Sequence, residues 1–163
     1  MKKNDVYFKN LDYLGDLNID YIIFDYEYLV LFTCLDNKNN LYLCVCCDIR
    51  NEQRWIITTI NEDTLINMLS DKITIRDAFV IEKFDHYLVK YYGPNKPEEC
   101  IKVFVSDIPT EDLPMEEEFI EADEGEFDQY IEVLRKRKLI FKYILFLDAN
   151  ENFATEQKKI KTY

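Results

Sequence analysis

The sequence is poor in residue types on which many enzymes depend. It has one histidine and three glycines among 163 residues. Because the glycines lie far apart, they cannot form a glycine-rich loop around a phosphate. Catalysis by a Ser-His-Asp or Cys-His arrangement needs a histidine oriented by a third group. The sole histidine, His86, follows Asp85 in a strand-like segment. We interpret it as a partly exposed strand histidine and predict no catalytic residue, no cofactor and a non-enzymatic protein.

Positive charge is also scarce. The chain has 20 lysines and arginines against 32 aspartates and glutamates, which gives a formal net charge of −12. Sequence-independent binding to nucleic acid draws its affinity from clustered cations that displace phosphate counterions, and an anionic membrane surface makes the same demand. The charge balance therefore argues against direct nucleic-acid binding and against membrane binding. It permits a basic partner, good solubility or nothing specific, and we predict another protein with a basic surface as the partner.

Long apolar runs are absent. The longest extends from Leu139 to Leu147 and is interrupted by Lys142. A helix needs about 20 apolar residues to span a bilayer, so this run predicts a final strand instead. The start, Met1 to Asp5, is slightly basic but leads into no apolar segment, so a signal peptide is not expected. We expect a cytoplasmic protein.

The five cysteines do not suggest a disulfide scaffold or a zinc site. Their number is odd, and four lie in strand-like segments: Cys34, Cys44, Cys46 and Cys47, with Cys100 as the fifth. On a strand, Cys44 and Cys46 share one face and Cys47 lies on the other. Structural zinc usually uses paired knuckles with a different spacing. We expect buried free thiols and no metal.

Apolar residues are abundant, at 48% of the chain, and their period indicates the fold. Strand-like stretches rich in β-branched and aromatic residues cover residues 19–25, 28–35, 41–48, 55–60, 84–92, 100–105 and 139–147. The third stretch is apolar on both faces, which predicts a central position. Asn- and Gly-Pro-containing turns are expected at 36–40, 50–53 and 93–97.

Helical signals interrupt the strands twice. Asn61 and Thr74 are typical N-cap residues ahead of short apolar-periodic stretches, and a further helix is expected from about residue 126. We predict an α+β fold with a single mostly antiparallel sheet and two to three helices packed on it. One domain is expected over 1–148, with an acidic irregular segment at 106–125 and a polar tail at 149–163.

The most distinctive feature is the stretch from Glu111 to Asp128, which holds ten acidic residues and no lysine or arginine. An acidic stretch with apolar anchors could dock on a basic groove, with charge steering the encounter. The alternative is a solvated loop that leads into a helix. The following basic run, 135–138, is interpreted as helix-terminal. The predicted partner-binding residues are Glu111, Asp112, Glu116, Glu117, Glu118, Phe119, Glu121, Asp123 and Glu124.

Residues 11–84 contain a series of short motifs. They are Phe24-Asp25-Tyr26, Leu31 to Cys34, Asn37 to Tyr42, Trp55-Ile56, Leu65 to Leu69 and Ile73 to Phe79. This series resembles a family of small uncharacterised bacterial domains of unknown function. The chain departs from that pattern at Glu27-Tyr28, where a Pro-containing turn is expected, and at Asn39 or Asn40, which replace a hairpin glycine. The resemblance implies a bacterial or phage setting and assigns no activity to any residue.

Together these observations predict a non-enzymatic, acidic protein-binding module. An accessory, immunity, antitoxin or inhibitor protein in bacterial or phage conflict would have this character. One alternative is a DNA mimic that occupies a nuclease or a DNA-binding protein. A second is a metal-dependent enzyme that uses acidic residues, and a third is a structural subunit whose tyrosines form a homo-oligomer interface.

Overall fold

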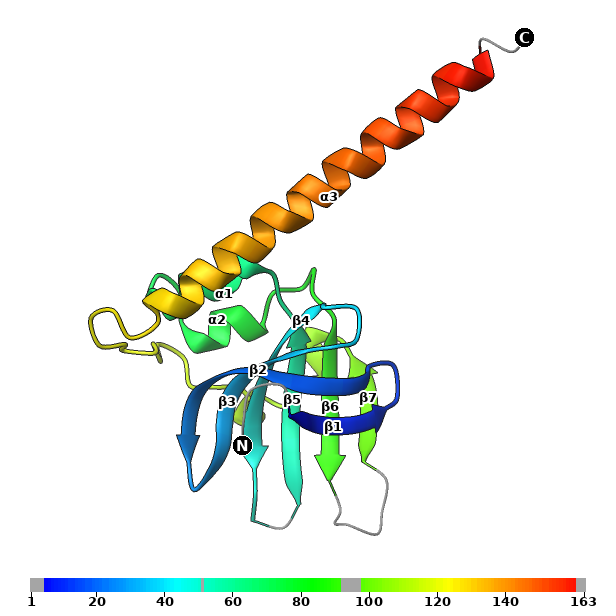
Figure 1. The fold of residues 1–163 in the computed structure, drawn as a ribbon. Helices are drawn as coiled ribbons and strands as arrows, with labels where there is room; N and C mark the ends of the chain where they lie inside the picture. The colour runs from blue at the N-terminus through cyan, green and yellow to red at the C-terminus, as the bar shows by residue number, and fades with distance from the viewer. Residues whose placement is uncertain (1–4, 51, 92–97, 161–163) are drawn as a thin grey trace. The chain divides into compact units, whose positions relative to one another are not determined.

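The computed structural model describes residues 5–50, 52–91 and 98–160 (Figure 1). The chain divides into two compact units, 1–123 and 124–163. The turn predicted at 93–97 lies outside the described residues, as does part of the turn at 50–53. The prediction of one domain ending at 148 stays a prediction.

The first unit is built on one antiparallel sheet of seven strands, which lie side by side in sequence order. This confirms the single antiparallel sheet expected from the apolar periodicity. Two helices interrupt the meander between the fifth and sixth strands. The strands are β1 (Val6–Leu11), β2 (Gly15–Tyr26), β3 (Tyr28–Leu35), β4 (Leu41–Asp48), β5 (Gln53–Thr59), β6 (His86–Tyr91) and β7 (Glu99–Val103).

The sheet is strongly curled rather than flat, because its first hairpin crosses over its own face. In Figure 1, β1 and the start of β2 run across the strands that follow. Several register shifts along β1 and β2 permit this bend, since bulges increase local twist. Gly15 begins β2 with φ +68°, a conformation that costs glycine little. The sequence had given no sign of β1.

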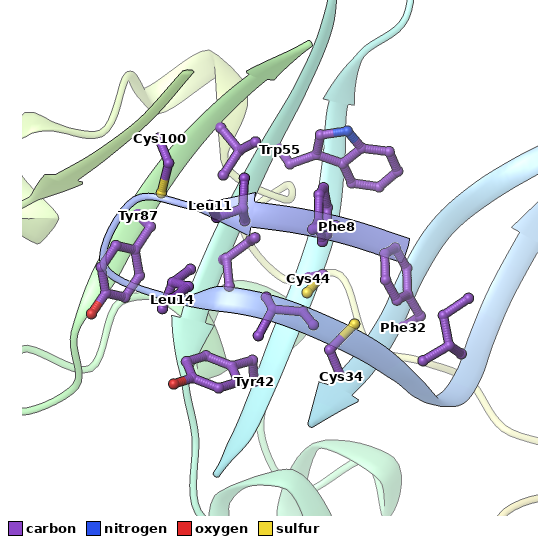
Figure 2. Packing of buried hydrophobic residues seen from close by; sticks show 14 residues of the cluster. Phe8, Leu11, Leu14, Phe32, Cys34, Tyr42, Cys44, Trp55, Tyr87 and Cys100 are labelled. Atoms are coloured by element: carbon purple, nitrogen blue, oxygen red, sulfur yellow. The ribbon is translucent and has the colours of Figure 1, made fainter. Parts of the chain in front are cut away.

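The crossing hairpin closes the main core. Phe8 of β1 lies 5.7 Å from the Trp55 ring and 6.3 Å from the Phe32 ring, measured between centroids. The Phe32 and Trp55 rings meet edge to face at 5.5 Å, a preferred aromatic geometry. Figure 2 shows Leu11 and Leu14 extending this contact toward Tyr87 and Cys100. Residues from both ends of the first unit therefore share one core.

Strand β4 lies at the centre of the sheet and is buried on both faces from Leu41 to Val45. Its Cys44 belongs to the core under the hairpin, whereas Leu43 points to the opposite face. Leu31 and Ile56 are also buried there. The double-sided apolar pattern of this strand therefore predicted its position correctly.

Two short helices, α1 (Glu62–Leu69) and α2 (Ile75–Phe79), connect β5 to β6. Both predicted caps are confirmed. The Asn61 side chain accepts a 2.8 Å hydrogen bond from the Thr64 amide. Thr74 and Asp77 form a reciprocal capping box, which satisfies two otherwise unpaired helix amides.

The second unit is dominated by a single long helix, α3 (Asp128–Ile160). The strand predicted over 139–147 is wrong, because those residues continue α3. An apolar run that only Lys142 interrupts fits a strand and a helix equally well. No glycine or proline occurs from 128 to 160 to end the helix begun at 128.

The described helices were compared with the dimensions of a bilayer. Among residues 5–50, 52–91 and 98–160, no helix is both long enough and apolar enough to span a membrane.

Candidate functional site

The acidic segment predicted to bind a partner follows β7. It contains two single turns of 3-10 helix, η1 (Val105–Asp107) and η2 (Thr110–Asp112), and then no helix or strand before α3. Prolines at 109 and 114 remove backbone donors and fix φ. The segment therefore gains its shape from contacts with β5, with Asp71 and with α2, rather than from the regular backbone hydrogen bonds of a helix or strand.

Asp112 is the main anchor of the segment to the sheet. Its Oδ1 accepts a 2.8 Å hydrogen bond from Nη2 of Arg54 on β5, and the Asp48 carboxylate lies 3.7 Å from the same nitrogen. Burial raises the pKa of Asp112, and the Arg54 charge opposes that rise. The structure places this predicted partner-binding carboxylate inside the fold, where it positions the segment.

Three further contacts hold the segment against the helical connection. The Glu118 carbonyl accepts a 2.9 Å hydrogen bond from the Ile75 amide at the start of α2. The Glu121 amide donates to the Asp71 carboxylate at 3.0 Å. The Arg76 guanidinium donates to the Pro114 carbonyl at 3.4 Å. These contacts fix the backbone and leave most of the carboxylates at the surface.

The surface of the segment combines carboxylates with two apolar side chains. Met115 is 71% exposed and Phe119 is 39% exposed. Phe119 was predicted from the sequence and Met115 was missed, although its place directly after Pro114 and before three glutamates could have revealed it. The predicted acids that are exposed are Glu111, Glu116, Glu117, Glu118, Glu121, Asp123 and Glu124.

Two of these glutamates adopt an unusual backbone. Glu117 has φ +60° and Glu121 has φ +54°, which is uncommon for residues with a Cβ. The turn at Glu117 reverses the chain between Met115 and Phe119, and the Met115 amide donates to the Glu118 carboxylate at 3.3 Å. The chain therefore holds a locally strained turn between its two exposed apolar side chains.

His86 joins the helical connection to the sheet. Its Nε2 lies 2.6 Å from the Phe79 carbonyl at the end of α2, and in the tautomer with a proton on Nε2 it donates to that oxygen. The His86 side chain is 2% exposed, so the predicted partial exposure is wrong. Desolvation lowers the pKa of His86, although the hydrogen bonds with the Phe79 and Phe84 backbone oppose the shift. The geometry indicates that His86 stabilises the packing of the end of α2 against β6.

The cysteines are free thiols in or beside the sheet. Cys34 and Cys44 are buried in neighbouring strands and share a hydrogen bond, and burial raises the pKa of Cys44. Burial also raises the pKa of Cys46 to about 11 and that of Cys47 to about 12, which disfavours the nucleophilic thiolate at neutral pH. Among the described residues, no three histidine, cysteine or acidic side chains are grouped so that they could hold a metal ion.

The first unit also carries a cleft of about 850 Å³ that the sequence did not indicate. Its wall includes the 2.9 Å ion pair between Lys102 and Asp85. Tyr13 and Phe104 contribute exposed aromatic rings. The cleft has room for a small ligand, and Glu82 and Lys83 add further charged side chains to its lining.

The chain was compared with protein-family models, curated proteins and solved structures, and none of them matches.

Proposed function

We propose that the chain is a protein-binding module whose acidic segment, residues 111–124, docks on a basic surface of another protein. The supporting observation is the pairing of exposed Met115 and Phe119 with glutamates on a backbone that is already fixed. A fixed backbone lowers the ordering cost of binding. The apolar pair supplies area to bury, and the surrounding carboxylates supply attraction and orientation.

An inhibitor, immunity or accessory protein of bacterial or phage conflict would use such a surface. The acidic segment would approach the basic groove of a nucleic-acid-binding or nuclease-like partner by long-range attraction. That attraction extends over about 8 Å at physiological salt. The exposed Met115 and Phe119 would then hold the complex once water is expelled around them.

The test is an affinity pull-down from host lysate at low and at high salt, read by mass spectrometry. The wild-type chain is compared with a Glu116→Lys, Glu117→Lys, Glu118→Lys variant. The proposal expects one stoichiometric basic protein that the wild type retains at low salt and the variant loses.

A matched control separates the segment from the overall charge. Asp12, Asp25 and Glu27 are exposed acids in the hairpins of the first unit, and their change to lysine alters the net charge by the same amount. The control variant should keep the partner. Equal loss in both variants would assign the capture to net charge and overturn the role of the segment.

A further inference from the structure

The cleft of about 850 Å³ in the first unit lies where β6 begins and β7 ends. His86 and Val103 are the last residues paired at this end of the β6–β7 ladder. Residues 82–85, which lead into β6, and residues 104–106, which follow β7, line the cleft together with Tyr13 from the turn between β1 and β2. Ligand pockets usually measure about 300–1,000 Å³, so the cleft is large enough for a small molecule.

Two exposed aromatic rings of the lining lie on the same face of the sheet. Tyr87 and Lys102 are directly opposite each other in the ladder, so their side chains share a face. The Tyr13 ring lies 6.3 Å from the Tyr87 ring, and Figure 1 shows the β1–β2 turn beside β6 and β7. Phe104 has an extended backbone, with φ −80° and ψ 155°, which places its side chain on the face of Lys102. Phe104 is 80% exposed and Tyr13 is 74% exposed, so a planar apolar ligand can stack on these rings.

Tyr13 is held at the cleft by a backbone conformation that does not suit tyrosine. The Leu14 amide donates to the Leu11 carbonyl at 3.3 Å, which makes Tyr13 the third residue of a four-residue turn. Its φ is +69°, and glycine or asparagine is favoured at this position when φ is positive. Because the ring is mostly exposed, its burial does not offset this strain. Strained residues of this kind are concentrated at ligand sites.

Charges of both signs accompany the rings. Nζ of Lys102 lies 2.9 Å from Oδ1 of Asp85, and the two side chains are 49% and 53% exposed. Glu82 and Lys83 are exposed and belong to the same lining. Among the described residues, the lining therefore holds two ammonium groups and two carboxylates. Because these charges cancel, a multiply charged anion such as a polyphosphate gains no net attraction. A ligand that carries one charge of each sign can pair with both partners of the ion pair.

We propose that this cleft binds an aromatic α-amino acid. The ligand's carboxylate pairs with Lys102, and its ammonium group pairs with Asp85. Both groups are attached to one carbon of the ligand, so they are as close to each other as the two partners of the 2.9 Å ion pair on the wall. The aromatic ring lies against Phe104 and Tyr13. This inference is independent of the acidic segment and of the protein partner proposed for it.

The first test compares four probes in nuclear magnetic resonance titrations of the isotope-labelled full chain. L-Tryptophan carries the ring and both charges, tryptamine lacks the carboxylate, indolepropionate lacks the ammonium group, and L-leucine lacks the ring. L-Tryptophan should shift the amide signals of Tyr13 and Ser106, with a dissociation constant on the order of 1 mM or tighter. Each of the other probes should bind at least about threefold more weakly. Equal affinities, or unchanged signals with L-tryptophan at about 10 mM, would overturn the proposal.

The second test uses two variants that each remove one exposed ring. Phe104→Ala takes the ring from the cleft and should weaken the binding of L-tryptophan about fivefold. Phe24→Ala removes a ring of β2 that is 55% exposed and lies outside the cleft lining. This control should leave the dissociation constant within about twofold. If the two variants have the same effect, the rings of the cleft do not hold the ligand and the proposal is wrong.

The third test identifies the partner of the ligand's carboxylate. Lys102→Met removes the ammonium group of the wall, so L-tryptophan should then bind no more tightly than tryptamine. The control is Lys90→Met on β6, which removes a lysine paired with Glu52 at 3.9 Å outside the cleft lining. This control should keep the preference for L-tryptophan over tryptamine. A preference that survives in Lys102→Met would overturn the proposed mode of binding.

Discussion

Phenylalanine side chains differ in their exposure to solvent between the two units of the chain. Phe8 of the first unit is 2% exposed, whereas Phe146 of the second unit is 63% exposed. In the sheet, alternate apolar residues lie on opposite faces, and other parts of the same chain cover both faces. The apolar surface of the sheet is therefore buried within the chain. In α3, apolar residues point in every direction over 139–147. The comparison teaches that apolar content alone does not locate a core.

The largest expected effect tests this difference directly. Phe8→Ala removes a ring from the Phe32–Trp55 cluster and should lower the free energy of unfolding by about 3–5 kcal/mol, as large-to-small core changes do. Phe146→Ala should change the unfolding of the first unit by less than about 0.5 kcal/mol. Urea denaturation followed by Trp55 fluorescence measures both. If the two variants lose a similar free energy of unfolding, the two units do not differ in how they use their apolar residues.

A second prediction concerns the anchor of the acidic segment. Asp112→Asn removes the closer of the two carboxylates beside the Arg54 guanidinium and should cost about 1–2 kcal/mol, within the range for hydrogen bonds to charged groups. Glu111→Gln changes an exposed neighbour and should be nearly neutral. Hydrogen exchange should show faster opening of residues 105–120 in the Asp112 variant alone. If hydrogen exchange of residues 105–120 is unchanged in the Asp112 variant, Asp112 does not anchor the acidic segment.

A third prediction follows from the lowered pKa of His86. In the unfolded chain His86 takes up a proton near its ordinary pKa of 6.5, whereas the folded protein resists protonation until a lower pH. The unfolded state therefore holds more protons just below pH 6.5. As the pH is lowered through this range, the free energy of unfolding decreases by up to about 1.4 kcal/mol per pH unit.

The measurement is urea unfolding between pH 7.5 and pH 5, with His86→Gln as the comparison. The variant should lose this part of the pH dependence, whatever its overall stability. A slope that is the same in both proteins would assign the acid sensitivity to other groups.

The smallest expected effect concerns the strained turn. Glu117 has φ +60°, and glycine adopts this conformation without the cost of about 1–2 kcal/mol that a Cβ imposes. Because glycine also adds freedom to the unfolded chain, Glu117→Gly should stabilise by about 0.5 kcal/mol, while Glu116→Gly should destabilise slightly. Thermal unfolding distinguishes the two, and destabilisation by both would show that the turn is unstrained.

Much of the sheet was predictable from the sequence because its signals are local. Apolar strands, Asn-rich turns and the caps at Asn61 and Thr74 each depend on a few neighbouring residues. Strand β1 was missed because Lys9 and Asn10 break its apolar pattern. The rings that Phe8 packs against, Phe32 and Trp55, also lie far along the chain. The run at 139–147 was misassigned because a stretch with one polar residue, Lys142, shows neither the strand period nor the helix period.

The candidate site was predictable only in composition. The sequence showed where the acids and Phe119 are, but burial of Asp112 depends on Arg54, which lies 58 residues earlier. Pro114 and the three glutamates mark Met115 as a surface residue, but no residue type indicates the positive φ of the turn at Glu117 that follows it. Long-range pairing and backbone strain are the physical reasons for both omissions.

The sequential order of the seven strands has a consequence for how the chain reaches its folded state. Each strand pairs with the next one along the chain, so hairpins can form from local encounters, which speeds folding. The crossing of β1 over β5 joins residues about fifty positions apart and must wait until that surface exists. We therefore expect the meander to assemble early during synthesis, and the docking of Phe8 on Trp55 to be its late, committing step.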